Sequence, residues 1–316
     1  MKQSFAFLYS LFLLFFAGCF ALAGSAKDTK SVTAVPKRVL LGGIIHSYTD
    51  DTLAFMPDGN TVFFDRSVGQ HKTVMVSHKI NGHWSQPHAA SFSGRWFDQN
   101  PVISPDGSYL LFDSDRPVKP GSKPLVQNYF GGRTQPGSNI WKVEYKSGKW
   151  AAPAWLGPVV NDDPFVDFPS IAADGTLYFL LWDQKAKVMH TWKSRYQDGK
   201  YLPPVRTGLG DPAVSTHDPA VAPDQSFIVF DYGKVKGGLG RLCIAFREGD
   251  HWGAPIDLGD AINKDLPWGA HIAPEGHTIY YTGQSGIWRL SLKPWLRMHQ
   301  AAFAATSPAV SDIFLF

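Results

Sequence analysis

One turn motif recurs five times along the sequence, and this repeat limits the folds open to the chain more than any other feature. Each copy is a turn of the Pro-Asp-Gly type followed by a short run of aromatic and branched apolar residues. Proline presets the backbone at such a turn, aspartate bonds its own backbone and glycine accepts a positive φ angle, so each copy predicts a β-hairpin. The five turns lie at residues 56–59, 104–107, 173–175, 223–225 and 274–276.

Two more strand-forming segments follow most of the hairpins. A third strand is expected at 140–143 and 287–290, for example. A Gly-x-aromatic turn, whose aromatic residue is Trp84, Trp150 or Trp252, then leads into a fourth strand. Four strands repeated about every fifty residues are typical of β-propeller blades. The sequence therefore predicts an all-β protein with five four-stranded blades over residues 37–292. Six blades stay open as an alternative if the unassigned tail, 293–316, forms strands.

The last repeat lacks a fourth strand of its own. Segments 156–161 and 258–263 share the pattern Leu-Gly-x-x-x-Asn, and 41–46 resembles it, with His46 in the place of the asparagine. We therefore expect the N-terminal segment to give the outer strand of the last blade. Such closure removes the exposed sheet edges that promote aggregation.

Residues 1–26 have the features of a signal peptide. Lys2 precedes an apolar run at 5–16, which is too short for a membrane span of about twenty residues. Two processing sites are open: an ordinary signal-peptidase site after Ala23, and a lipobox that would make Cys19 the lipidated first residue. Both predict an exported protein, either periplasmic or tethered to the outer membrane, which contacts a membrane only through a lipid on Cys19.

Charge and cysteine content exclude several functions. The formal net charge is +3 and no run of Lys and Arg could follow a phosphate backbone, so we expect no nucleic-acid binding. Cys243 lies in an apolar run, which predicts a buried structural thiol rather than a nucleophile. The eleven histidines show no metal-site spacing and no nucleotide-binding loop is evident, so we predict neither a metal nor a cofactor.

The second repeat carries a longer pattern. Residues 101–107 read Pro-x-x-Ser-Pro-Asp-Gly, an aromatic strand follows, and then come Ser-Asp-Arg at 114–116 and Asn-Ile-Trp at 139–141. This pattern resembles the TolB-like, WD-like β-propeller repeat family of exported bacterial proteins, and the resemblance covers residues 37–292. It implies a binding or scaffolding module of the cell envelope. The Ser-Asp-Arg element is degraded in the first repeat and missing from the last three.

The first strand of each propeller blade lines the central channel. Counting back six residues from the proline of each turn, or from its equivalent, gives one position per blade, and strand alternation places the five side chains on equivalent faces. We expect a ring near one channel mouth that binds a sugar or a cation, with loop 117–138 contributing. The alternative is that these polar residues are simply hydrated in the channel and bind no ligand. The five predicted ring residues are Asp51, Gln99, Asp167, His217 and Trp268.

The sequence thus favours a non-catalytic, monomeric binding module whose ligand is an envelope protein or a glycan. The alternative is a glycoside-active enzyme, which needs a pair of carboxylic acids. The usual glutamate acid on an inner strand is missing, so this alternative would depend on channel aspartates. Its candidate catalytic residues are Asp51, Asp98, Asp167 and Asp218.

Overall fold

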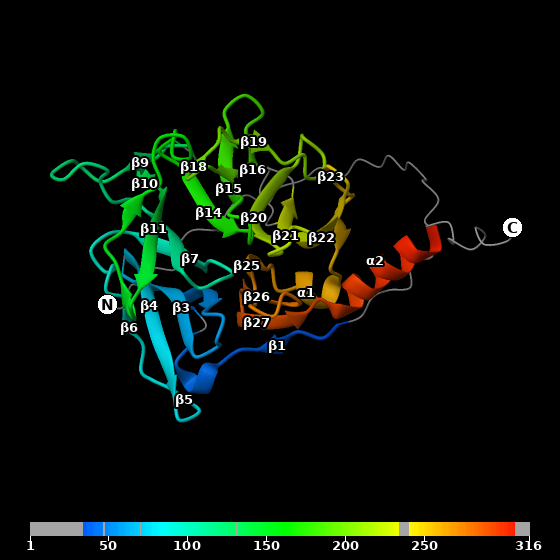
Figure 1. Cartoon of the computed structure of the whole chain (residues 1–316), viewed down its shortest axis with the longest axis horizontal. Helices are drawn as coiled ribbons and strands as arrows, with labels where there is room; N and C mark the ends of the chain where they lie inside the picture. Colours follow the sequence, from blue (N-terminus) through cyan, green and yellow to red (C-terminus); the bar gives the residue numbers. More distant parts are fainter. Residues whose placement is uncertain (1–33, 47, 70, 130–131, 234–239, 307–316) are drawn as a thin grey trace, which may run out of the picture.

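The structure is a computed structural model of the 316-residue chain, and it describes residues 34–46, 48–69, 71–129, 132–233 and 240–306. Five antiparallel sheets surround a common centre (Figure 1). The predicted all-β, five-bladed propeller is thereby confirmed. The predicted signal peptide, the possible lipidation site Cys19 and the end of the tail, 307–316, lie outside the described residues.

The first three strands of each blade follow the chain from the inside outwards, and only the outer strand of the last blade comes from elsewhere in the sequence. The innermost strands are β2 (Asp50–Phe55), β7 (Asp98–Ile103), β14 (Val166–Ile171), β20 (Ser215–Val221) and β25 (Trp268–Ile272). The second strands are β3 (Thr61–Val68), β8 (Tyr109–Ser114), β15 (Leu177–Asp183), β21 (Phe227–Gly233) and β26 (Thr278–Gly283). The third strands are β4 (His71–Ile80), β11 (Asn139–Lys146), β16 (Val188–Ser194), β22 (Arg241–Glu248) and β27 (Gly286–Ser291).

The outer strands are short. They are β5 (His83–Trp84), β6 (His88–Ala89), β12 (Lys149–Trp150), β13 (Ala154–Trp155), β19 (Val205–Arg206), β23 (His251–Trp252), β24 (Ile256–Asp257) and, in the last blade, β1 (Lys37–Arg38). A separate two-stranded hairpin, β17 (Tyr196–Gln197) with β18 (Lys200–Tyr201), precedes β19. Short edge strands limit unwanted pairing with other chains.

The five predicted turns form for the expected physical reason. Each closes with a backbone hydrogen bond across the turn, from Gly59 to Met56 (2.9 Å) in the first blade, for example. In the same turn Asp58 Oδ1 accepts the amide of Asn60 at 2.9 Å. Gly59 has a φ angle of 68°, and Gln225 takes the same left-handed place in the fourth turn at 58°.

The N-terminal segment closes the last blade, as predicted. Lys37 pairs with Arg289 and Arg38 with Trp288, and the segment then buries Ile44 between the first and last blades. The two Leu-Gly-x-x-x-Asn segments have a shared role: Asn161 and Asn263 bond both backbone groups of Ile140 and Leu242, on the third strands. In the N-terminal copy the amide of His46 instead donates to Asp50 Oδ2 at 2.8 Å.

Aromatic side chains pack adjacent blades together. Trp150 of the second blade meets Phe63 of the first edge-on at 5.2 Å, and Trp252 of the fourth blade meets Tyr178 of the third at 6.4 Å. Such contacts add to area burial and explain the recurrence of tryptophan at the start of the fourth strand. Cys243 is 4 % exposed, and burial raises the pKa of its thiol to about 12, as expected for a structural residue.

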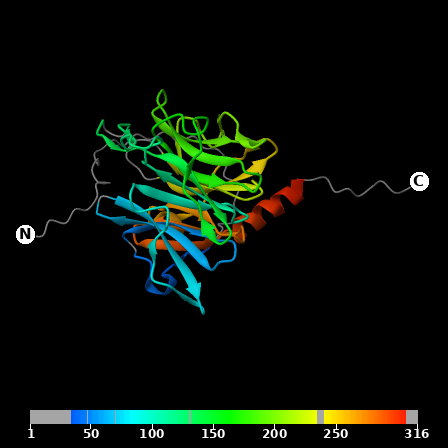
Figure 2. The same ribbon diagram turned by 60° about the vertical axis from the view of Figure 1, so that its left-hand side comes forward.

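The tail left unassigned from the sequence begins as a helix, α2 (Lys293–Thr306). Its Trp295 is 1 % exposed and packs in the core shared by the fourth and fifth blades. Leu296 and Met298 pack against the same core and His299 stacks on Phe246 at 4.0 Å, and the C-terminal end of the helix then projects from the propeller (Figure 2). Within the described ranges, no helix has the length and apolar character needed to cross a membrane.

Candidate functional site

The five inner strands share a break in backbone geometry at one position. There the φ angle lies between 48° and 60°, and pairing with the second strand shifts by one residue. Such β-bulges re-aim neighbouring side chains and are frequent beside functional sites. A positive φ angle is costly for residues with a bulky or branched side chain, so the surrounding structure must enforce it. The five left-handed residues are Thr52, Asn100, Phe168, Asp218 and Gly269.

Each predicted ring residue comes directly before one of these left-handed residues. The inner strands contact one another in a closed ring, from β2 through β7, β14, β20 and β25 back to β2. The bulges therefore bring five corresponding side chains to one end of a common channel. Asp167 is buried, and the other four are partly exposed: Asp51, Gln99, His217 and Trp268.

The bulges also turn backbone amides towards the preceding blade. The amide of Asn100 donates to Asp65 Oδ2 at 3.1 Å, and the amide of Phe168 donates to Asp113 Oδ2 at 2.9 Å. Asp65 and Asp113 stand on the second strands β3 and β8, opposite ring residues. These carboxyl groups therefore join adjacent blades, a structural role that needs no ligand.

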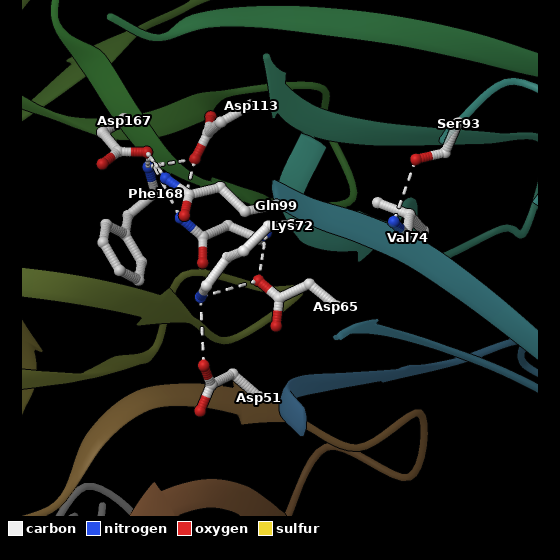
Figure 3. A network of polar contacts seen from close by, with 10 residues as sticks. Asp51, Asp65, Lys72, Val74, Ser93, Gln99, Asp113, Asp167 and Phe168 are labelled. Carbon is white, nitrogen blue, oxygen red and sulfur yellow. Dashed lines mark hydrogen bonds and ion pairs between the residues drawn. The ribbon is translucent and has the colours of Figure 1, made fainter. Parts of the chain in front are cut away.

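Lys72 of β4 brings a positive charge into this group (Figure 3). Its Nζ lies 3.0 Å from Asp51 Oδ2 and 3.4 Å from Asp65 Oδ2. Burial alone would lower the pKa of Lys72, but the charges of Asp65 and Asp51 and their hydrogen bonds raise it above its usual value. Burial raises the pKa of Asp51, and Lys72 offsets this only in part.

Two carboxyl groups from adjacent blades, Asp113 and Asp167, share donors. Asn100 Nδ2 lies 2.9 Å from Asp113 Oδ2 and 3.2 Å from Asp167 Oδ1, and the amide of Phe168 reaches the same two oxygens (Figure 3). The two carboxyl groups therefore lie side by side around shared donors. Burial and the neighbouring carboxyl of Asp167 raise the pKa of Asp113 well above its usual range.

The fourth blade contributes two more carboxyl groups and a neutral imidazole. Asp218 Oδ2 accepts the amide of Gly269 at 2.8 Å. Burial and the charge of Asp231 raise the pKa of Asp218, and burial raises the pKa of Asp231 to about 7. Burial lowers the pKa of His217 to about 4, so this ring residue is uncharged at neutral pH.

Asp98, a candidate of the hydrolase alternative, is held in an ion pair. Its Oδ1 accepts from Arg116 Nη2 at 2.7 Å and from Ser114 Oγ at 2.6 Å, and its side chain is fully buried. Asp50 is bonded in the corresponding way to Arg66 in the first blade, at 2.7 Å. Both ion pairs lie at the first residue of an inner strand, and in each the arginine neutralises the carboxylate.

The opposite end of the channel is lined mostly by apolar residues. A cavity of about 70 Å³ lies at the C-terminal ends of the inner strands, and all five blades line it. Its lining includes His271, whose pKa burial lowers to about 4. A cavity of about 530 Å³ lies elsewhere, between α1 (Asp260–Asn263) and the seam at Trp288. The polar groups of the ring thus gather at one end of the channel only.

Blade 2 carries its long insertion, residues 117–138, beside this polar end. The insertion includes a small hairpin, β9 (Val126–Gln127) with β10 (Gln135–Pro136). Tyr129 donates to Asp163 Oδ2 at 2.8 Å, and its ring stacks on Trp182 at 6.4 Å. Phe165 meets the same tyrosine edge-on and precedes Asp167 by two residues. The insertion therefore adds aromatic surface next to the channel mouth, on the side of the third blade.

Reasoning from the sequence found the inner-strand positions but missed the second-strand carboxyl groups and Lys72. The sequence does contain a signal for the second-strand carboxyl groups. A Phe-Asp pair follows three of the five turns, at Asp65, Asp113 and Asp231. Lys72 has no such signal, because it stands on a third strand and reaches the channel by the length of its side chain.

Comparison with known proteins gives similarity at the level of the fold. No protein-family model matches the chain, and no curated protein is similar to it. A putative TolB from Agrobacterium tumefaciens is 14 % identical over 73 % of this chain and 69 % of its own, with a TM-score of 0.47. TolB from Acinetobacter baumannii is 14 % identical over 77 % of this chain and 43 % of its own, with a TM-score of 0.37.

A gluconolactonase from Xanthomonas campestris is 11 % identical over 84 % of this chain and 99 % of its own, with a TM-score of 0.44. The five-bladed architecture itself rests on the strand pairing of this chain.

Proposed function

We propose that the protein is an exported, non-catalytic binding or scaffolding module of the cell envelope, which takes a glycan or a protein partner at the polar end of its channel. One observation carries this proposal. Five side chains from five blades converge at one end of the channel, each aimed by a bulge, while the other end is lined mostly by apolar residues. A concave opening with convergent polar groups is the default location for a ligand.

The carboxyl groups argue for binding rather than glycoside hydrolysis. A hydrolase needs two carboxyl groups about 5–10 Å apart, one of them free to act as an acid. Asp167 instead shares the Asn100 Nδ2 and Phe168 amide donors with Asp113, and Asp98 is neutralised by Arg116. Asp218 accepts a backbone amide of the next blade. Three of the four candidate aspartates are therefore engaged in contacts within or between blades, and the fourth, Asp51, is paired with Lys72.

The proposal for location rests on the sequence. Residues 1–26 have the features of an export signal, which ends either after Ala23 or at a lipid-carrying Cys19. A protein delivered in this way would meet glycans and envelope proteins as its partners. We propose that it acts there as a monomer.

A calorimetric screen of the purified protein against envelope oligosaccharides and short envelope peptides tests this function. A ligand at about 100 times its dissociation constant should raise the free energy of unfolding by about 2.7 kcal/mol. Gln99→Leu and Trp268→Ala should each weaken binding roughly tenfold, since both side chains belong to the ring. The matched control Gln86→Leu changes an exposed residue outside the ring and should bind normally. A ligand that binds all four proteins equally would place the site elsewhere.

A further inference from the structure

The polar end of the channel has many more carboxyl groups than cations. Arg66 and Arg116 lie nearby, but each is bonded to another aspartate, Asp50 and Asp98. Lys72 is the single cation of the described residues that is bonded to the channel carboxyl groups. The full chain has a net charge of +3, so this acidity is a local feature rather than a consequence of composition. Six aspartates from four blades form the group: Asp51, Asp65, Asp113, Asp167, Asp218 and Asp231.

These groups act on one another across the channel. Asp218 of the fourth blade interacts electrostatically with Asp231, with Asp167 of the third blade and with Lys72 of the first. Asp167 in turn shares the Asn100 Nδ2 and Phe168 amide donors with Asp113 of the second blade. Charges interact strongly in a buried setting of low dielectric constant.

Among the described residues, three carboxyl oxygens of this group have no hydrogen-bond partner. They are Asp65 Oδ1, Asp113 Oδ1 and Asp231 Oδ1, and all three residues are buried. The other oxygen of Asp65 and of Asp113 is bonded to its neighbours. Asp65 and Asp51 lie on two sides of the Lys72 ammonium, so the carboxyl of Asp65 points into the acidic group (Figure 3). A buried acceptor without a donor is unfavourable, and a ligand with N–H groups would relieve this.

We propose that the polar end of the channel binds an organic cation, a protonated amine or a guanidinium group. This rests on the proposed function and adds the chemical class of its ligand. Such groups supply positive charge together with three to five N–H donors. Asp51 and Lys72 have side chains that are 19 % and 21 % exposed, which leaves the site open to solvent on their side.

The spacing of the acidic groups favours an organic cation over a metal ion. Across the parts of the chain that the structure describes, no three carboxyl, imidazole or thiol groups are arranged to hold a metal. The acceptors are instead spread over several blades, which suits a larger cation with several donors. The cation comes either from a Lys or Arg side chain of a partner protein or from a free polyamine.

Binding should release protons. The pKa values of Asp51, Asp113, Asp218 and Asp231 are raised, chiefly by burial, so part of this group is protonated near neutral pH. A cation lowers these pKa values, so affinity should rise with pH. A neutral sugar would have no comparable effect. The groups facing the bound cation are Asp51 on β2, Asp65 on β3, Lys72 on β4, Asp113 on β8, Asp167 on β14, His217 and Asp218 on β20, and Asp231 on β21.

Calorimetric titration of the processed protein tests this with two probes, spermidine and a short peptide with blocked ends that contains Lys and Arg. We expect affinity to rise roughly tenfold between about pH 6 and pH 8, with proton release visible as a dependence on buffer ionisation heat. Affinity should fall in high salt. Asp51→Asn should weaken binding roughly tenfold. The control Asp250→Asn removes the same charge from an exposed outer turn and should bind as the wild type does.

The Lys72→Met variant distinguishes a change at the site from misfolding, because it is expected to gain affinity rather than lose it. It removes the internal ammonium that occupies Asp51 and Asp65, so the folded variant should bind the probes more tightly than the wild type. Preference for spermidine identifies a free amine as the ligand, and preference for the peptide identifies a protein partner. Failure of both probes, or wild-type binding by Asp51→Asn, overturns the inference. If a neutral oligosaccharide then binds in a Gln99-dependent way, the proposed function still stands; if it does not, both are overturned.

Discussion

Replacing Arg116 with methionine is expected to destabilise the protein by about 3–5 kcal/mol. The Arg116 side chain is buried, and its Nη2 donates to Asp98 Oδ1 at 2.7 Å and to the carbonyl oxygen of Phe92 at 3.1 Å. It also lies over the rings of Phe112 and Trp141. Methionine keeps much of the packing but leaves the Asp98 carboxylate buried without a cation. The midpoint of urea denaturation measures the loss.

Two further variants separate the charge from the packing. Arg95→Met removes an exposed arginine that also stacks on a tryptophan, and it should cost less than about 1 kcal/mol. The double variant Arg116→Met with Asp98→Asn should recover part of the loss, because no carboxylate is then left unpaired. If Arg116→Met alone costs no more than Arg95→Met, the buried pair does not stabilise the second blade as described.

Replacing Ile45 with aspartate is expected to cost about 4 kcal/mol and to open the ring at its seam. Ile45 is 6 % exposed and packs with Val39, Ile44 and Phe64 in the core between the last and first blades. A charge there would be buried without a partner, and β1 is held to β27 by only two residue pairs. Urea denaturation and limited proteolysis of the last blade would both report the change.

Leu40→Asp is the matched control for this seam variant. Leu40 lies in the same segment but is 52 % exposed, so the same change should alter the free energy of unfolding by less than about 1 kcal/mol. Equal effects of the two substitutions would show that the N-terminal segment does not close the ring through its buried face.

The blades were predictable because each depends on local chemistry. A turn such as 56–59 contains the residues that its backbone requires, and the run after it is aromatic and branched apolar, as in a strand buried on both faces. The closing strand was predictable for a different reason, because the last repeat lacked a fourth strand and the first segment resembled the missing part. The long insertion 117–138 was also visible, although its hairpin was not.

The ring of bulges was not predictable from local preference. Thr52 and Phe168 are poor residues for a left-handed backbone, and only Gly269 favours it strongly. The conformation is enforced instead by contacts between blades, such as the amide of Phe168 on Asp113. The same is true of the site: the ring positions followed from counting along strands, whereas the place of Lys72 depends on tertiary packing that no repeat in the sequence records.

Hydrogen–deuterium exchange of the full protein, with and without a bound ligand, tests most directly the claim that ligands enter the polar end of the channel. The account predicts slower exchange at the starts of the five inner strands, including the amides of Asn100 and Phe168, and no change at the seam around Trp288. Protection confined to the seam cavity or to the outer strands, with the inner strands unchanged, would contradict it.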